Sequence, residues 1–250
     1  MSTPTFPDAS LSLSPDAQQR MAAEFETPRR SSEHPSDAAV TRWAKWMMPR
    51  GTVLPARIAA TDLARPLARR RIEQVLQAGG PRRLHIGSGS SYKPGWTNID
   101  LLPVKVDVPW NLARGIPFPD ASVDAVFHEH LQEHLTLGQG FALARESLRV
   151  LRPGGVLRIG VPDAGQALQS YAGNWDDDWA RSAATPMIAV QRLFYEHQHR
   201  AMYDGQTLKL MLEVAGFVDV TRCAFGEGRA ADADSPARAA GTLYVEGLRP

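Results

Sequence analysis

Two short segments carry residue types that could hold a nucleotide-like ligand. Gly87-Ser88-Gly89 follows the apolar run Leu84-His85-Ile86, and Asp100 ends the next such run. Glycines at the carboxyl end of a first strand allow a tight turn and the close approach of a ligand to the backbone. An acid at the end of a second strand can accept hydrogen bonds from the ribose hydroxyls of an adenosine group. Alone, the two features fit equally well a glycine turn followed by an acid that caps a turn or helix.

The distance between the two segments argues against a nicotinamide cofactor. Ten residues separate Gly89 from Asp100, and they include Pro94 and Gly95. A full crossover helix needs a dozen residues or more. The dehydrogenase pattern G-x-G-x-x-G, with an acid about 20 residues further on, is not matched.

Histidines supply the candidates for proton transfer. His128, His130 and His134 follow the run VDAVFH, and His199 lies in the segment FYEHQHRAMYD. Histidine suits general-base chemistry near neutral pH. His130 and His134 are spaced to share one helical face, and a metal site is conceivable there. However, the metalloprotease order H-E-x-x-H is absent, so the sequence predicts no bound metal and a mainly structural role for His134.

Strand-like and helix-like segments alternate through most of the chain. The strand-like runs are RRLHIG, TNIDLL, VDAVFH, VLRIGVP, FVDVTRCAF and TLYVEGL, and helical patterns cover residues 140–151 and 204–216. This alternation predicts an α/β protein whose mostly parallel sheet is covered on both faces. Residues 226–240 are small and polar, which predicts a mobile loop.

Before the first strand, composition separates two regions. Residues 1–36 are rich in Ser, Pro and Asp, which predicts a disordered arm. Residues 37–80 are predicted to be a helical extension or lid, with Trp43, Trp46 and Met47 on one apolar face and a second helix over 55–78 that Pro66 should split. The apolar face of the first helix would pack within one chain or against a second copy, so a homodimer is one alternative.

Composition excludes several classes of protein. The formal net charge of +1 offers no general attraction for nucleic acid or an anionic membrane. The single cysteine, Cys223, excludes an internal disulfide and a cysteine-rich metal motif. No signal peptide or long apolar run is evident, so the expected location is the cytoplasm.

Four motifs in order resemble the class I S-adenosylmethionine (SAM)-dependent methyltransferases, and in particular a predicted bacterial branch similar to methyltransferase type 11. They are LHIGSG, GWTNID, the stretch IPFPDASVDAVFHEHLQEHL from Ile116, and LRVLRPGGVLRIGVPD, which ends at Asp163. The resemblance implies a Rossmann-like seven-stranded sheet with helices on both faces and the last strand antiparallel. It also implies that residues 81–250 bind SAM and that residues 170–203 are an insertion covering the substrate.

The resemblance carries roles onto individual residues. The cofactor-binding set that it implies is His85, Gly87, Ser88, Gly89, Asp100, Leu101, Asp107, Val108 and Glu129. His130 is the first candidate for a catalytic base, with Asp163 and His199 as its competitors. His85 stands where many relatives carry an acid, which leaves the contacts to the methionine part of SAM open.

The expected activity is methyl transfer to a small molecule or glycan, at oxygen rather than at nitrogen or carbon. Two alternatives remain. One is a non-catalytic module of the same fold that binds a partner through Trp43, Trp46 and Met47. The weaker alternative is a nicotinamide-dependent oxidoreductase.

Overall fold

The computed structural model describes residue 19 and residues 53–172, 182–195 and 198–250. The predicted helix that carries Trp43, Trp46 and Met47 lies outside the described residues, as does the predicted arm apart from residue 19. The partner surface and the dimer contact suggested for that helix therefore stay predictions.

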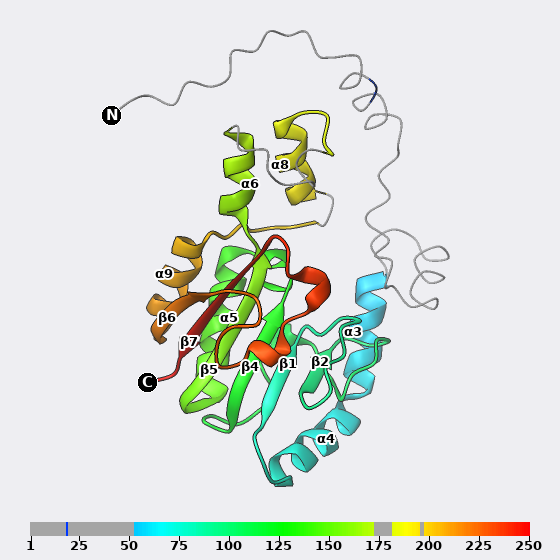
Figure 1. The fold of residues 1–250 in the computed structure, drawn as a ribbon. Helices are drawn as coiled ribbons and strands as arrows, with labels where there is room; N and C mark the ends of the chain where they lie inside the picture. Colours follow the sequence, from blue (N-terminus) through cyan, green and yellow to red (C-terminus); the bar gives the residue numbers. More distant parts are fainter. Residues whose placement is uncertain (1–18, 20–52, 173–181, 196–197) are drawn as a thin grey trace.

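A seven-stranded sheet forms the centre of the protein, in the order β3-β2-β1-β4-β5-β7-β6 (Figure 1). The strands are β1 (Arg83–Ile86), β2 (Thr97–Asp100), β3 (Val108–Pro109), β4 (Val123–Glu129), β5 (Leu151–Pro162), β6 (Val218–Cys223) and β7 (Thr242–Leu248). The first five run parallel to one another, and β7 runs antiparallel to both of its neighbours. The predicted sheet, with its last strand antiparallel, is confirmed.

Six α-helices are described around this sheet. They are α3 (Val53–Leu63), α4 (Arg65–Gln77), α5 (Leu137–Val150), α6 (Ala164–Tyr171), α8 (Pro186–Tyr195) and α9 (Gly205–Ala215). The predicted split at Pro66 is confirmed, because this proline occupies the first turn of α4, where its missing N–H costs nothing. Thr136 and Gln139 form a capping box that begins α5 at Leu137, earlier than the apolar pattern predicted.

Different segments cover the two faces of the sheet. Apolar residues of α4, α5 and α9 join the strands in one large core, with Ile72, Leu143 and Leu212 among them. Segment 224–240 crosses the opposite face with two short 3-10 helices, and its Ala230 and Ala233 are buried there against Phe127 (Figure 1). This segment was predicted to be a mobile loop. It is instead part of the core, because its small side chains let the backbone lie close to the sheet.

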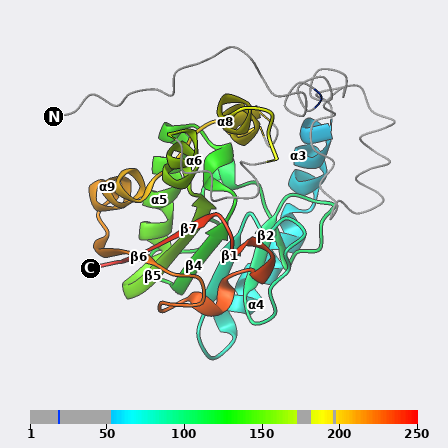
Figure 2. The same ribbon diagram turned by 45° about the horizontal axis from the view of Figure 1, so that its top comes forward.

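The connections at the carboxyl ends of the parallel strands surround the candidate site. They are the glycine turn after β1, the loop after β2, the short 3-10 helix η2 (Gln132–His134) after β4, and α6 after β5. Helices α6 and α8 lie side by side beyond this edge of the sheet (Figure 2). Part of the predicted insertion, residues 173–181 and 196–197, lies outside the described residues.

Within the described part of the chain, no helix combines the length and apolar character needed to cross a bilayer.

Candidate active site

The glycine turn after β1 meets the loop after β4. Gly87 and Gly89 have φ angles of +64° and +53°, a backbone region that glycine adopts without a steric penalty. A Cβ atom on Gly87 would lie 2.6 Å from Cδ2 of Leu131, whereas a Cβ atom on Gly89 would meet no atom of the described residues within 4 Å. The backbone at Gly89 therefore borders open space, where a ligand can approach it.

Asp100 contacts this turn from the neighbouring strand. Its Oδ2 accepts a hydrogen bond from the backbone N–H of Gly89 at 2.7 Å, and its Oδ1 accepts one from the N–H of Leu101 at 2.5 Å. A carboxylate has about four acceptor positions, so both oxygens can still accept bonds from ligand hydroxyls. Asp100 and the glycine turn, which the sequence predicts to belong to one ligand site, thus lie in direct contact.

Arg57 of α3 is a neighbour of this acid that sequence reasoning missed. Its guanidinium donates to the backbone oxygens of Leu102 and Leu101 at 2.8 and 3.0 Å, and Nη2 lies 3.6 Å from Oδ1 of Asp100. One turn later on the same helix, the hydroxyl of Thr61 accepts a bond from the N–H of Leu102 at 2.9 Å. These contacts hold α3 against the loop after β2. The apolar period that identified the helix gives no signal for the partner of an arginine more than 40 residues away.

Several other residues of the predicted cofactor set make contacts inside the protein. Asp107 accepts hydrogen bonds from the backbone and side-chain nitrogens of Asn98 at 2.8 and 3.0 Å, and from the hydroxyl of Tyr92 at 2.8 Å. Val108 is fully buried in the core. The two residues support β2 and β3 in this structure, and their contact with a cofactor stays a prediction.

His85 is buried beside Asn98. Its Nδ1 lies 3.0 Å from Oδ1 of Asn98, and its ring centroid lies 5.2 Å from that of Phe127. Burial lowers the pKa of His85 to about 4. The hydrogen bond with Asn98 raises this pKa, and the nearby Lys93 ammonium lowers it further. The imidazole is therefore neutral at physiological pH and cannot replace the charge of the acid found in many relatives.

β4 ends in polar residues that point to different places. Glu129 accepts hydrogen bonds from the hydroxyl of Tyr244 at 2.6 Å and the N–H of Ser235 at 3.2 Å, on the side covered by segment 224–240. His128 is fully buried, and desolvation lowers its pKa to about 4. Its two ring nitrogens have no hydrogen-bond partner among the described residues. In the part of the chain that the structure describes, Glu129, a predicted cofactor residue, thus makes its contacts with segment 224–240 and β7 and not with the histidine cluster.

His130 stands at the turn after β4, with a φ of +54° and 26% of its side chain exposed. Its Nδ1 lies 3.1 Å from Oε1 of Glu133, and its Nε2 lies 3.1 Å from the hydroxyl oxygen of Thr242. Thr242 donates its own proton to the backbone oxygen of Arg238 at 2.5 Å, so its oxygen faces His130 as an acceptor. The ring is therefore oriented from both sides.

The three predicted catalytic residues do not converge on one point. Nε2 of His199 lies 3.9 Å from Oε1 of Glu133, so His199 and His130 approach the same carboxylate. Asp163 instead pairs with Arg222 at 2.8 Å and accepts a bond from the N–H of Gln166 at 3.1 Å in the first turn of α6. Asp163 has structural partners in this arrangement, and the roles of all three residues stay predictions.

Glu133 lies at the centre of this cluster. Its side chain is 2% exposed. Burial acts to raise the pKa of Glu133, but the imidazoles of His130 and His134 outweigh it and hold the pKa below its ordinary value. A buried, ionised carboxylate among imidazoles is thus the main electrostatic feature beyond the glycine turn. No local motif of the sequence marks Glu133 as part of a site.

The strand order and the contact between the glycine turn and Asp100 agree with what the resemblance to class I SAM-dependent methyltransferases implies. Residues 103–159, less than a quarter of the chain, match a family described as a methyltransferase domain. A search of curated proteins found no match.

The chain also resembles solved structures at low sequence identity. A SAM-dependent methyltransferase from Thermotoga maritima is 14% identical, with 77% of this chain and 96% of that chain covered and a TM-score of 0.44. One from Archaeoglobus fulgidus is 18% identical, with 75% and 94% covered and a TM-score of 0.44. A phosphoethanolamine N-methyltransferase of Haemonchus contortus in complex with S-adenosylhomocysteine is 13% identical, with 72% and 52% covered and a TM-score of 0.40.

The residues around the glycine turn fit S-adenosylmethionine, the cofactor that the resemblance implies. The space beside Gly89 adjoins a carboxylate that can accept hydrogen bonds from a ribose. Residues 87–96, all of them described, contain no helix. The helix N-terminus on which a nicotinamide dinucleotide places its pyrophosphate is thus missing from this connection.

Proposed function

We propose that the protein transfers the methyl group of SAM to an oxygen atom of a small molecule or glycan. One observation carries this proposal: the open backbone at Gly89 lies in hydrogen-bonding contact with Asp100, at the carboxyl ends of two parallel strands. Ligands of open α/β sheets bind at this edge.

The chain's own part in the reaction is to bind and align. SAM supplies an activated methyl group on its sulfonium, so no covalent nucleophile of the protein is needed. Asp100 would accept hydrogen bonds from the ribose, and the turn at Gly87 and Gly89 would leave room for the methionine part. Helix α3, fixed by Arg57, would shield this side of the site from water. Correct placement of the two reactants then provides much of the rate enhancement.

His130 is our candidate for the residue that contacts the acceptor. It is partly exposed, and it precedes Leu131, the side chain that approaches Gly87. An imidazole at this place can hydrogen-bond an acceptor hydroxyl, which supports oxygen as the methylated atom. Helices α6 and α8, with the exposed ring of Tyr195, stand beyond the same edge and would bound the acceptor's space.

We further propose that the protein acts in the cytoplasm on a small acceptor rather than on nucleic acid. The net charge of +1 supports this, because phosphate-rich partners are generally bound by strongly basic surfaces.

Calorimetric titration of SAM and S-adenosylhomocysteine into the full chain tests the cofactor half of the proposal. We expect the wild type to bind both compounds and Asp100→Ala to bind at least tenfold more weakly, a loss of about 1.4 kcal/mol or more. Asp120→Ala is the matched control, because Asp120 is an exposed acid paired with Arg149 before β4. It should bind like the wild type. A folded wild type that binds neither compound would rule out the proposed function.

Turnover of SAM with a panel of hydroxyl-bearing acceptors tests the other half. His130→Gln should keep its affinity for SAM and lose at least tenfold in rate with an acceptor that the wild type methylates. An unchanged rate would remove His130 from the acceptor site.

A further inference from the structure

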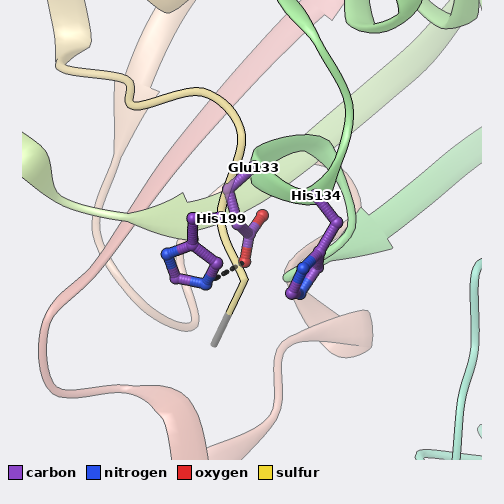
Figure 3. Close-up of side chains that lie close together, drawn as sticks. All are labelled: Glu133, His134 and His199. Carbon is purple, nitrogen blue, oxygen red and sulfur yellow. Dashed lines mark ion pairs between the residues drawn. The ribbon is translucent and has the colours of Figure 1, made fainter. Parts of the chain in front are cut away.

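A buried carboxylate and two imidazoles meet beside the candidate acceptor site (Figure 3). Glu133 and His134 come from η2, and His199 comes from the segment between α8 and α9. One ligand atom from each residue lies within 4.8 Å of the others, and the centroids of the two imidazole rings are 5.0 Å apart. In the close-up, the Glu133 carboxylate stands between the two rings.

The surroundings of Glu133 indicate that a cation is needed here. The Glu133 carboxylate lies 3.1 Å from Nδ1 of His130 and 3.9 Å from Nε2 of His199, but among the described residues neither of its oxygens makes a hydrogen bond of regular geometry. The nearby side-chain oxygens of Gln132 and Tyr203 are likewise buried without a described partner. Burying a carboxylate whose oxygens lack regular hydrogen bonds is unfavourable unless another group compensates it. Unsatisfied buried polar atoms that gather at one place indicate an additional bound species.

We infer that Glu133, His134 and His199 bind one divalent transition-metal ion of the kind that imidazole and carboxylate ligands select, with Zn²⁺ as the reference ion. Two histidines and one carboxylate form a known protein ligand set for zinc and for non-haem iron, and they leave coordination positions open. The ion would neutralise the buried carboxylate.

The geometry needs only a local adjustment to bind the ion. Ligand atoms about 2.1 Å from a tetrahedral ion lie roughly 3.4 Å apart. Nε2 of His199 already lies 3.9 Å from Oε1 of Glu133. His134 is exposed, so the ion can enter from that side. His130, at 3.1 Å from the same carboxylate, would orient it, as second partners of metal ligands commonly do.

The position also suggests a role for the ion. The cluster follows β4 directly, and its Glu133 contacts His130, the residue that we propose to contact the acceptor. An open coordination position of the ion would therefore take an oxygen atom of the acceptor. A metal ion that binds a hydroxyl favours its ionised form and fixes its orientation. This role rests on the proposed function, whereas the binding of the ion does not.

The sequence did not predict this site because its three ligands show no local metal motif. Glu133 and His134 are adjacent in the chain, and His199 follows 65 residues later, after α5, β5, α6 and α8. Only the fold brings the third ligand to the first two.

Equilibrium dialysis of the chelator-treated full chain against buffered Zn²⁺, with bound metal measured by mass spectrometry, tests the inference. We expect one tightly bound equivalent in the wild type and at least tenfold weaker binding in His134→Gln, His199→Gln and Glu133→Gln. His134→Gln is the most informative variant, because its side chain is exposed and the substitution removes no core packing. His85→Gln is the matched control: it removes an imidazole from β1, beside Phe127, and should bind Zn²⁺ like the wild type.

Circular dichroism and SAM titration of the same samples separate the possible failures. A wild type that binds no Zn²⁺, or a folded His134→Gln that binds it as the wild type does, would overturn the metal site and leave the proposed function intact. A wild type that binds Zn²⁺ through these residues but does not bind SAM would support the metal site and overturn the proposed function.

Discussion

The two glycines of the turn after β1 have different neighbours and should respond differently to the same substitution. Gly87→Ala places a methyl group 2.6 Å from Leu131 in a left-handed backbone conformation. Gly89→Ala meets the same backbone penalty, about 1–2 kcal/mol, but its methyl group enters open space. We therefore expect Gly87→Ala to lower the free energy of unfolding more than Gly89→Ala does, by at least about 1 kcal/mol.

SAM affinity should complete this comparison. Gly89→Ala should weaken SAM binding by at least tenfold although it stays the more stable of the two variants, because its methyl group occupies the ligand's side of the turn. Urea unfolding and calorimetric titration of both proteins check the pair. Full SAM affinity in Gly89→Ala would move the cofactor away from this turn.

Buried histidine makes the stability of the protein depend on pH. The pKa of His85 is lowered from an ordinary 6.5 to about 4, so the unfolded chain binds a proton in a pH range where the folded chain does not. The contribution of neutral His85 to the free energy of unfolding is therefore fully present above pH 6.5 and is lost as the pH drops toward 4. At about 1.4 kcal/mol per pH unit, the loss from this one residue reaches roughly 2 kcal/mol by pH 5.

Urea unfolding at pH 7 and pH 5 measures this loss. His85→Gln keeps an amide that can donate to Asn98 but cannot titrate, so its stability should fall less between the two pH values than that of the wild type. Equal losses in the two proteins would mean that His85 binds its proton in the folded state as readily as in the unfolded one.

At the scale of elements, one arginine ties segment 224–240 to the sheet. Arg158 of β5 is fully buried and makes two hydrogen bonds of 2.6 Å to Asp234 and one of 2.9 Å to Glu246. Arg158→Met would leave both carboxylates buried without their partner, at a cost of about 3–5 kcal/mol. Lys209→Met, which breaks an exposed pair with Glu213, should cost less than about 1 kcal/mol. Similar losses from the two substitutions, measured by thermal or urea unfolding, would contradict a structural role for the buried pairs.

The long elements were predictable because their patterns are local. The apolar runs located β1, β2, β4, β5, β6 and β7, and the helical periods located α4, α5 and α9. β3 was missed because its two residues, Val108 and Pro109, are too short to show a period. Segment 224–240 was misjudged because small residues look like a loop in sequence, while the burial of Ala230 and Ala233 depends on the sheet beneath them.

At the scale of the whole molecule, the candidate site likewise contains contacts that local sequence patterns predicted and contacts that they did not. The contact between Gly89 and Asp100 was predictable, because both lie at the carboxyl ends of adjacent parallel strands. The positions of Arg57 and His199 were not, because each depends on how an element distant in sequence packs against this edge. The motifs thus predicted the contact between the glycine turn and Asp100, whereas the neighbours that Arg57 and His199 contribute became visible only in the fold.

The sheet order also has a consequence for the synthesis of the chain. β7 pairs with β5 on one side and β6 on the other, yet it follows both in sequence. Until a ribosome has released Leu248, β5 therefore presents a long unpaired edge, and β6 has no strand beside it. Unpaired edges of this kind invite association with other chains. We expect a nascent chain halted before Thr242 to bind chaperones. It should dissociate from them once β7 has been made and has paired with both β5 and β6.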